Sequence, residues 1–129
     1  MMKGKKGIIF GVANQRSIAW GIAQKLLENG AEVAFSYMGE RLKGSLEKLI
    51  IDYPQCKMYE CDASDENQIE NVAEQFKNDH GSCDFIVHSI AFADKDYLLG
   101  NFYKTPKDVF LQSMDISAYT LVSITRHFE

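Results

Sequence analysis

The sequence has little proline and little cysteine, and it contains no long uninterrupted run of apolar residues. Two of the 129 residues are proline and three are cysteine, at Cys56, Cys61 and Cys83. An odd number of cysteines without paired spacing does not fit a disulfide framework and indicates free thiols in a reducing compartment. No apolar run reaches the length of a membrane-spanning helix, and no signal-peptide core follows the basic N-terminus. We therefore expect a cytoplasmic protein without a membrane span.

Metal ligands and a strong charge are lacking as well. No histidine lies at ligand spacing from the cysteines, so we expect no metal site and interpret the thiols as buried or inert. The 14 Lys and Arg residues are outnumbered by 18 Asp and Glu residues, which gives a net charge of −4. This balance does not suggest nucleic acid or an anionic membrane surface as a partner. The length is sufficient for one globular domain with a core.

The rest of the chain is organised around the stretch from Gly7 to Gly30, GIIFGVANQRSIAWGIAQKLLENG. Residues 7–12 form a short apolar run typical of a buried strand. After a polar loop, apolar residues recur from Ser17 onward with helical spacing, at Ile18, Ala19, Ile22, Ala23, Leu26 and Leu27. The stretch therefore predicts a strand, a tight loop and a helix that ends near Gly30, the first unit of a dinucleotide-binding fold.

The predicted loop has the properties of a phosphate site. A helix N-terminus carries unpaired N–H groups and partial positive charge, and it therefore attracts phosphate. Gly11 would let the backbone turn sharply and approach a ligand, and Ser17 is expected to cap the helix and could also face a pyrophosphate oxygen. The standard G-x-G-x-x-G fingerprint is absent, so these residues alone favour phosphate binding and a plain strand–loop–helix unit about equally.

Strands and helices alternate through the following residues. Apolar runs predict strands over residues 31–37, 57–61 and 84–90. Helical spacing predicts helices over 41–51, from a cap at Ser64 to Gly81, over 106–113, and from a cap at Asp115 to residue 128. Alternation with short connections indicates a parallel sheet covered on both faces. We therefore predict an α/β fold, a three-layer, Rossmann-type, doubly wound parallel sheet.

The last helical pattern runs to the final residue, Glu129, without a glycine, proline or cap. We interpret this end as a truncation, so that residues 1–129 would form one dinucleotide-binding domain, incomplete after the fourth strand and its helices. Ligands of such sheets bind beyond the C-terminal strand ends. That rule selects residues 11–17, 37–38, 62–63 and 89–93 as candidate site positions.

Five short strings carry a resemblance to a known family: GVANQRSIAWGIA at 11–23, FSY at 35–37, CDA at 61–63, HSIAFA at 88–93 and DISAY at 115–119. Together they closely resemble the bacterial NADH-dependent enoyl-acyl-carrier-protein reductases, a branch of the short-chain dehydrogenase/reductase superfamily. Typical members of that superfamily have instead a G-x-x-x-G-x-G loop and an Asn-Asn-Ala-Gly string. The resemblance covers essentially the whole chain.

The resemblance implies that the cofactor is NADH/NAD and that its binding residues are Gly11, Ser17, Ile18, Met38, Asp62, Ala63, Ile90 and Ala91. The first three match residues at the pyrophosphate and ribose, and Met38 lies next to the adenosine ribose. Asp62 and Ala63 match the pair that contacts adenine, where a carboxylate can accept from the amino group. The last two lie beside the nicotinamide ribose, and Ala93 matches a backbone contact to substrate.

The same resemblance implies reduction of trans-2-enoyl thioesters of acyl carrier protein, in fatty-acid synthesis, by a homotetramer. The resemblance places the family's catalytic tyrosine and lysine in a segment beyond Glu129. We therefore assign no catalytic residue to the chain and expect it to be inactive alone. A short-chain carbonyl reductase and a non-catalytic dinucleotide-binding fragment remain as alternatives.

Several of these residues also have purely structural interpretations. Without the resemblance, Asp62 is more often a polar strand end, and His88, within an apolar strand, is more often a satisfied core histidine than a catalytic one. The predicted strand end Tyr37-Met38-Gly39 contains no Arg or Lys for a 2′-phosphate, nor an acid for a 2′-hydroxyl. We predict a preference for NADH, which Arg16 or Arg41 could overturn.

Overall fold

The computed structural model describes all residues, 1–129, and shows strands and helices in strict alternation through the first two thirds of the chain. The elements are β1 (Lys6–Phe10), α1 (Ile18–Glu28), β2 (Glu32–Tyr37), α2 (Glu40–Leu49), β3 (Met58–Glu60), α3 (Glu66–His80) and β4 (Phe85–His88). Two short 3₁₀ turns follow, at Lys95–Tyr97 and Phe102–Lys104. The chain then returns as one long helix made of α4 (Lys107–Met114), a π-helical turn (Asp115–Tyr119) and α5 (Thr120–Phe128).

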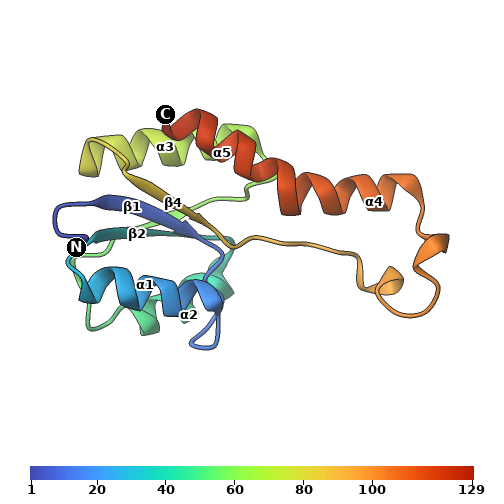
Figure 1. Cartoon of the computed structure of the whole chain (residues 1–129), viewed down its shortest axis with the longest axis horizontal. Helices are drawn as coiled ribbons and strands as arrows, with labels where there is room; N and C mark the ends of the chain where they lie inside the picture. The colour runs from blue at the N-terminus through green and yellow to red at the C-terminus, as the bar shows by residue number, and fades with distance from the viewer.

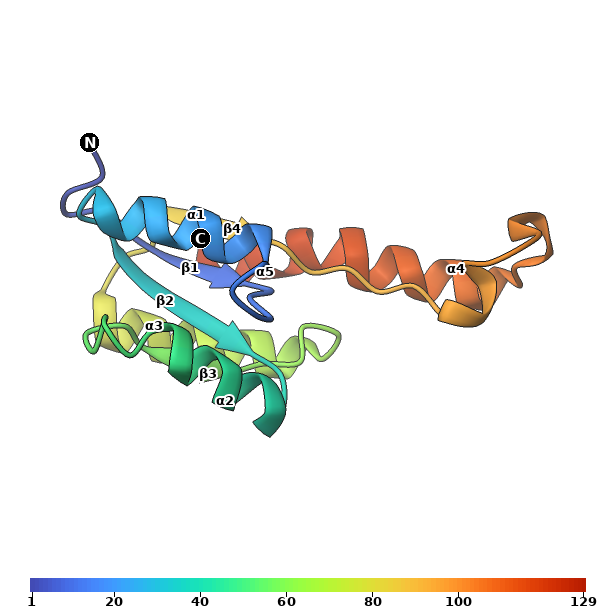
Figure 2. The same ribbon diagram turned by 90° about the horizontal axis from the view of Figure 1, so that it is seen from below.

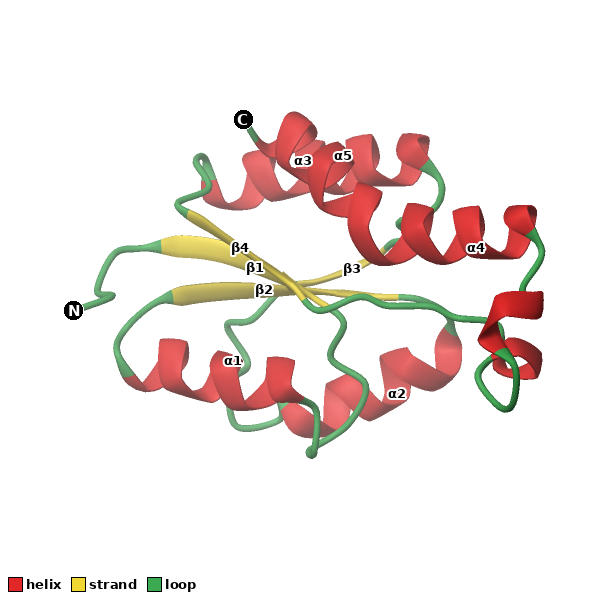
Figure 3. Cartoon of the chain, turned by 45° about the vertical axis from the view of Figure 1, so that its right-hand side comes forward, coloured by secondary structure: helices red, strands yellow, loops and turns green.

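The four strands form one parallel sheet in the order β3-β2-β1-β4. Helices α1 and α2 cover one face, and α3 and α5 cover the other (Figures 1 and 3). From β1 the chain adds β2 and β3 on one side and then adds β4 on the other side of β1. The strand order therefore reverses at β1, which lies between β2 and β4. This is the predicted doubly wound, three-layer arrangement, and the prediction of an α/β, Rossmann-type fold is confirmed.

Both faces of the central strand are buried, which explains its unbroken apolar run. Successive side chains of a strand point to opposite faces, so Ile9 packs with Trp20 and Phe35 beneath α1, whereas Ile8 packs with Ile69 under α3. Neither isoleucine is exposed. The sheet therefore has a hydrophobic core on each face, and this packing holds the strand ends in a fixed position.

The buried face of α1 differs from the predicted stripe. Ile18 is 81% exposed and Ile22 is also exposed, whereas Ala19, Trp20 and Ala23 face the sheet. The large ring of Trp20 lies 6.2 Å from the ring of Phe35 and takes the place beside the sheet. The side chain of Ile18 is thereby directed to solvent, near the start of the helix.

The segment after β4 leaves the sheet, and α4 projects beyond it (Figures 1 and 2). A helix was predicted over 106–113, and α4 confirms it within one residue. The predicted cap at Asp115 is wrong, because Asp115 lies inside the long helix. Residues 107–128 contain no glycine or proline, so nothing interrupts the helical hydrogen bonding.

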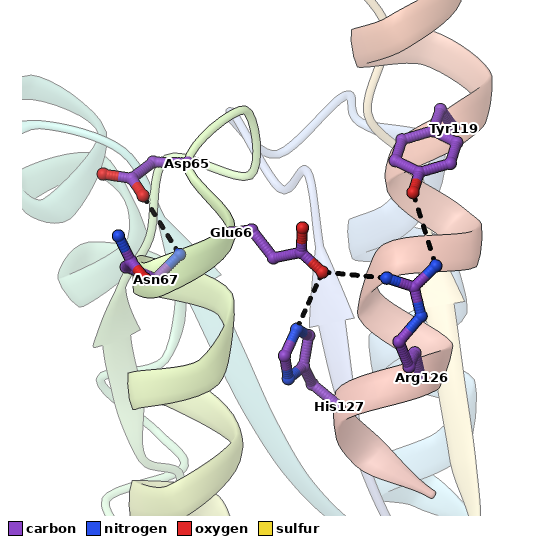
Figure 4. A network of polar contacts seen from close by, with 6 residues as sticks. All are labelled: Asp65, Glu66, Asn67, Tyr119, Arg126 and His127. Carbon is purple, nitrogen blue, oxygen red and sulfur yellow. Dashed lines mark hydrogen bonds and ion pairs between the residues drawn. The ribbon is translucent and has the colours of Figure 1, made fainter.

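Polar side chains join α5 to the start of α3 (Figure 4). Arg126 donates to Glu66 at 3.0 Å and to the hydroxyl of Tyr119 at 3.3 Å, and His127 lies 3.1 Å from the same carboxylate of Glu66. Glu66 is in the first turn of α3 and Arg126 is in the last turn of α5, where each of these two charges suits the helix dipole. No helix of the structure combines the length and the apolar character that crossing a membrane requires.

Candidate nucleotide-binding site

The carboxyl ends of all four strands meet around a cavity of about 410 Å³. Six of the predicted cofactor-binding residues line it: Gly11, Met38, Asp62, Ala63, Ile90 and Ala91. Ser17 and Ile18 lie outside this lining, on the loop and at the first turn of α1. Ala93 lines a second cavity of about 480 Å³, formed by the segment after β4 and by α4.

Gly11 lies where the ends of β1 and β4 come closest together. Its φ is +105°, and a Cβ at this position would overlap the backbone carbonyl of Ser89. A side chain is therefore excluded by conformation and by space, and the backbone of β1 is exposed directly to the cavity. The sequence predicted the sharp turn, but not the contact with a residue 78 positions later.

The hydroxyl of Ser17 organises the loop between β1 and α1. It accepts hydrogen bonds from the backbone N–H groups of Ala13 and Asn14, both at 3.0 Å, and makes no bond to the helix. Ser17 occupies the predicted N-cap position, but its side chain does not cap the helix, because the hydroxyl is turned back into the loop. The N–H groups of Ile18 and Ala19 have no partner in the protein; Ile18 is exposed, whereas Ala19 is buried, so only the N–H of Ile18 is open to an anion.

The end of β3 is held by a second polar turn. Oδ1 of Asp62 accepts from the backbone N–H of Ser64 at 3.0 Å and from its hydroxyl at 2.6 Å. The prediction that Ser64 caps α3 is wrong. The helix begins one residue later, at Glu66, and its cap is Asp65, which accepts from the N–H of Asn67 (Figure 4). Oδ2 of Asp62 makes no hydrogen bond and can accept one from a ligand.

Cys61, which lines the cavity, and His88, at the end of β4, have structural roles. Burial raises the pKa of the Cys61 thiol to about 12, and the neighbouring carboxylates of Asp62 and Asp65 add to the effect, so this thiol is inert. Nε2 of His88 lies 2.8 Å from the hydroxyl of Thr120, and burial lowers the pKa of this imidazole. His88 is thus a neutral histidine with a partner in the protein, as the structural interpretation predicts.

The strand-end rule missed six residues that line the cavity: Ser36, Leu42, Cys61, Ser64, Gln112 and Ile116. Three of them, Ser36, Cys61 and Ser64, directly adjoin positions that it selected. Leu42 lies in α2, close to a strand end that was selected, and its position could have been inferred. Gln112 and Ile116 come from the long helix, which returns to the cavity more than 20 residues after β4. No pattern in the neighbouring sequence predicts that these two residues line the cavity.

A parallel sheet in the order 3-2-1-4, with a glycine turn and a helix start at its carboxyl edge, defines the Rossmann-type class of dinucleotide-binding proteins. The family model described as "Enoyl-(Acyl carrier protein) reductase" matches residues 11–129. The chain belongs to this family, within the short-chain dehydrogenase/reductases.

Its relatives are curated enoyl-acyl-carrier-protein reductases. The NADH-dependent enzyme 1 of Rhizobium meliloti is 44% identical over 124 residues, which are 96% of this chain and 46% of that protein. The NADPH-dependent enzyme of Staphylococcus aureus is 38% identical over 125 residues, 95% of this chain and 49% of that protein. The chain thus spans about half the length of the curated relatives it matches.

Solved structures agree with these relatives. The enzyme of Candidatus Liberibacter asiaticus superposes with a TM-score of 0.94 at 42% identity, over 98% of this chain and 49% of that chain. The enzyme of Anaplasma phagocytophilum, solved in complex with NAD, gives a TM-score of 0.93 at 40% identity, over 98% of this chain and 48% of that one.

Proposed function

We propose that the protein containing these residues reduces trans-2-enoyl thioesters of acyl carrier protein with NADH, and that residues 1–129 are its dinucleotide-binding part. The observation that carries the proposal is the cavity at the carboxyl edge of the sheet, lined by six of the predicted cofactor residues in a chain of this family. Membership of the family supports the reaction, and the names of the relatives supply the substrate class.

The residues around the cavity fit a dinucleotide. The unoccupied Oδ2 of Asp62 suits the amino group of adenine, and the bare backbone at Gly11 with the free N–H group of the exposed Ile18 suits the pyrophosphate. The other nucleoside would lie across β1, against Ile90 and Ala91. When bound, the reduced nicotinamide supplies the hydride for the enoyl double bond.

The residues that would hold the adenosine ribose favour NADH over NADPH. The end of β2 presents Tyr37 and Met38, and the next charged residue is an acid, Glu40, in the first turn of α2. A 2′-phosphate requires a positioned arginine, which this strand end does not provide. Arg16 and Arg41 are the nearby cations in the sequence, and either of them could reverse the preference. The relatives include enzymes of both kinds.

Chemistry at the thioester is assigned to residues outside 1–129, and this chain contributes no catalytic group to the proposal. Ala93 would contribute a backbone contact to substrate from the second cavity. Exposed apolar side chains on the long helix, among them Phe110, Leu111, Leu121 and Val122, support a homo-oligomer, which the family resemblance suggests is a tetramer.

The test is NADH oxidation by the full natural protein that contains this chain, with the crotonyl thioester of acyl carrier protein as substrate. We expect turnover at an enzyme-like rate, ~1 s⁻¹ or above, and none from a protein of residues 1–129 alone. A higher kcat/KM with NADPH would contradict the cofactor assignment. Reduction of a ketone but not of the enoyl thioester would favour a carbonyl reductase.

A further inference from the structure

The strand β4 continues into three residues, Ser89, Ile90 and Ala91, that form one wall of the cavity. This segment will be called the β4 exit. Beyond the bond that the N–H of Ser89 donates to the carbonyl of Phe10 at 2.9 Å, no neighbouring strand holds it. The β4 exit therefore needs contacts with another part of the protein if it is to present a fixed surface to a ligand.

The long helix provides that support at both ends of the β4 exit. Beyond its far end, the hydroxyl of Ser117 accepts from the backbone N–H of Phe92 at 3.0 Å and donates to the carbonyl of the same residue at 3.1 Å. One side chain thus pairs with both polar backbone groups of Phe92, as a neighbouring strand would do.

At the near end, the support is the hydroxyl of Thr120, which is 2% exposed. It donates to the carbonyl of Ile116 at 2.7 Å and lies 2.8 Å from Nε2 of His88. A hydroxyl has one hydrogen, so with that hydrogen on Ile116 it accepts from the N–H of His88. This arrangement fixes the tautomer of the histidine that ends β4.

Ser117 lies in the π-helical turn and Thr120 directly follows it, three positions later. Residues three apart on a helix face the same side, so both hydroxyls reach the β4 exit. Single π-helical turns within α-helices occur frequently at functional sites. Ile116, in the same turn, itself lines the cavity.

We infer that Ser117 is a positioning residue for the nicotinamide half of the cofactor, acting through the backbone of the β4 exit. The inference rests on the proposed function. Because β1 separates the β4 exit from the ends of β2 and β3, the effect is confined to one half of a dinucleotide. Phe92 is 42% exposed, so water can satisfy its backbone when the hydroxyl is removed, and the Ser117→Ala protein is expected to fold.

The experiment measures dissociation constants for NADH and for ADP, which has the adenosine and both phosphates but no nicotinamide riboside. In the full natural protein, Ser117→Ala is expected to raise the dissociation constant of NADH about fivefold to tenfold, the effect of one or two modest hydrogen bonds. The dissociation constant of ADP should stay unchanged. The matched control is Thr125→Ala, because the hydroxyl of Thr125 bonds only to the carbonyl of Leu121 on the same helix.

Each outcome decides a different question. Partial unfolding would weaken the binding of both ligands by the same factor, so it does not change the ratio of the two dissociation constants. An equal loss for NADH and ADP, or no loss, would overturn the positioning role and leave the proposed cofactor in place. If the unsubstituted protein binds neither ligand, the proposed function fails and the inference fails with it.

Discussion

The two walls of the cavity are held in different ways. The wall at β3 is built by contacts within a few residues, from Asp62 to Ser64 and from Asp65 to Asn67. The wall at β4 depends on partners far along the chain, Ser117 for Phe92 and Thr120 for His88. The turns at β3 need only residues close in the sequence, whereas the contacts that hold the β4 wall form only when the long helix has docked. Substitutions should therefore affect the two walls differently.

The largest effect is expected at Gly11, where the end of β1 lies against the β4 wall. Gly11→Ala should lower the free energy of unfolding by ~3 kcal/mol or more, because positive φ and overlap with the Ser89 carbonyl combine. Urea denaturation of the full natural protein measures it. The control is Gly21→Ala, which has open space around the added methyl and should stabilise α1 by up to ~1 kcal/mol. Equal stability of the two variants would contradict this account.

A smaller loss is expected from the β4 wall itself. Thr120→Val keeps the shape of the side chain but leaves His88 without its partner, which should cost ~2 kcal/mol. Thr125→Val removes an exposed hydroxyl with the same type of helix bond and should change stability by less than ~0.5 kcal/mol. Thermal unfolding of the two variants side by side tests the difference. If Thr120→Val is as stable as Thr125→Val, the long-range support is not energetically important.

On the β1 side, Ser17→Ala should cost ~1 kcal/mol through the loss of two loop hydrogen bonds. Because the pyrophosphate is common to both ligands, the affinities for NADH and for ADP should fall by the same factor. Ser117→Ala, in contrast, is expected to lower the affinity for NADH alone. Isothermal titration with both ligands distinguishes the two serines. Unchanged affinities with a lowered melting temperature would leave Ser17 a purely structural role.

The least effect is expected from pH, and it concerns only the β4 wall. Burial lowers the folded-state pKa of His88 below its ordinary 6.5, so the neutral form is favoured in the folded protein. The stability gained is present above pH 6.5 and is lost as the pH falls from 6.5 through the folded pKa. Urea unfolding at pH 7.5 and pH 5.5 should show a smaller decrease for His88→Gln than for the unsubstituted protein. An identical decrease would show that other groups carry the pH dependence.

The contrast between local and long-range contacts also explains which parts of the fold and of the site could be predicted from the sequence. The apolar runs and helical spacing around Gly7–Gly30 predicted the parallel α/β fold, since each strand and helix has a local signature. The strand-end rule selected Gly11, Met38 and Asp62, which the structure brings together. Ser17 and Ser64 were predicted as helix caps, but both hydroxyls bond within neighbouring loops instead. A hydroxyl has several partners within reach, and spacing does not decide which one it takes.

Long-range contacts could not be predicted in this way. Nothing near Gln112 or Ile116 indicates that they line the cavity, and Asp115 has the usual residue type of a cap although it lies within a helix. The exposure of Ile18 was missed because the ring of Trp20 determines which face of α1 packs on the sheet. These outcomes depend on how distant elements compete for the same surface.

The central place of β1 has a consequence for the order of folding. Gly7 pairs with Val33, 26 residues later, and with Phe85, 78 residues later. Closing the longer loop costs roughly 1 kcal/mol more in chain entropy, so we expect β1 and β2 to associate before β4 arrives. The early intermediate would contain the wall at β3 without the wall at β4. The cavity would then be completed only in the last step of folding, when β4 and the long helix dock together.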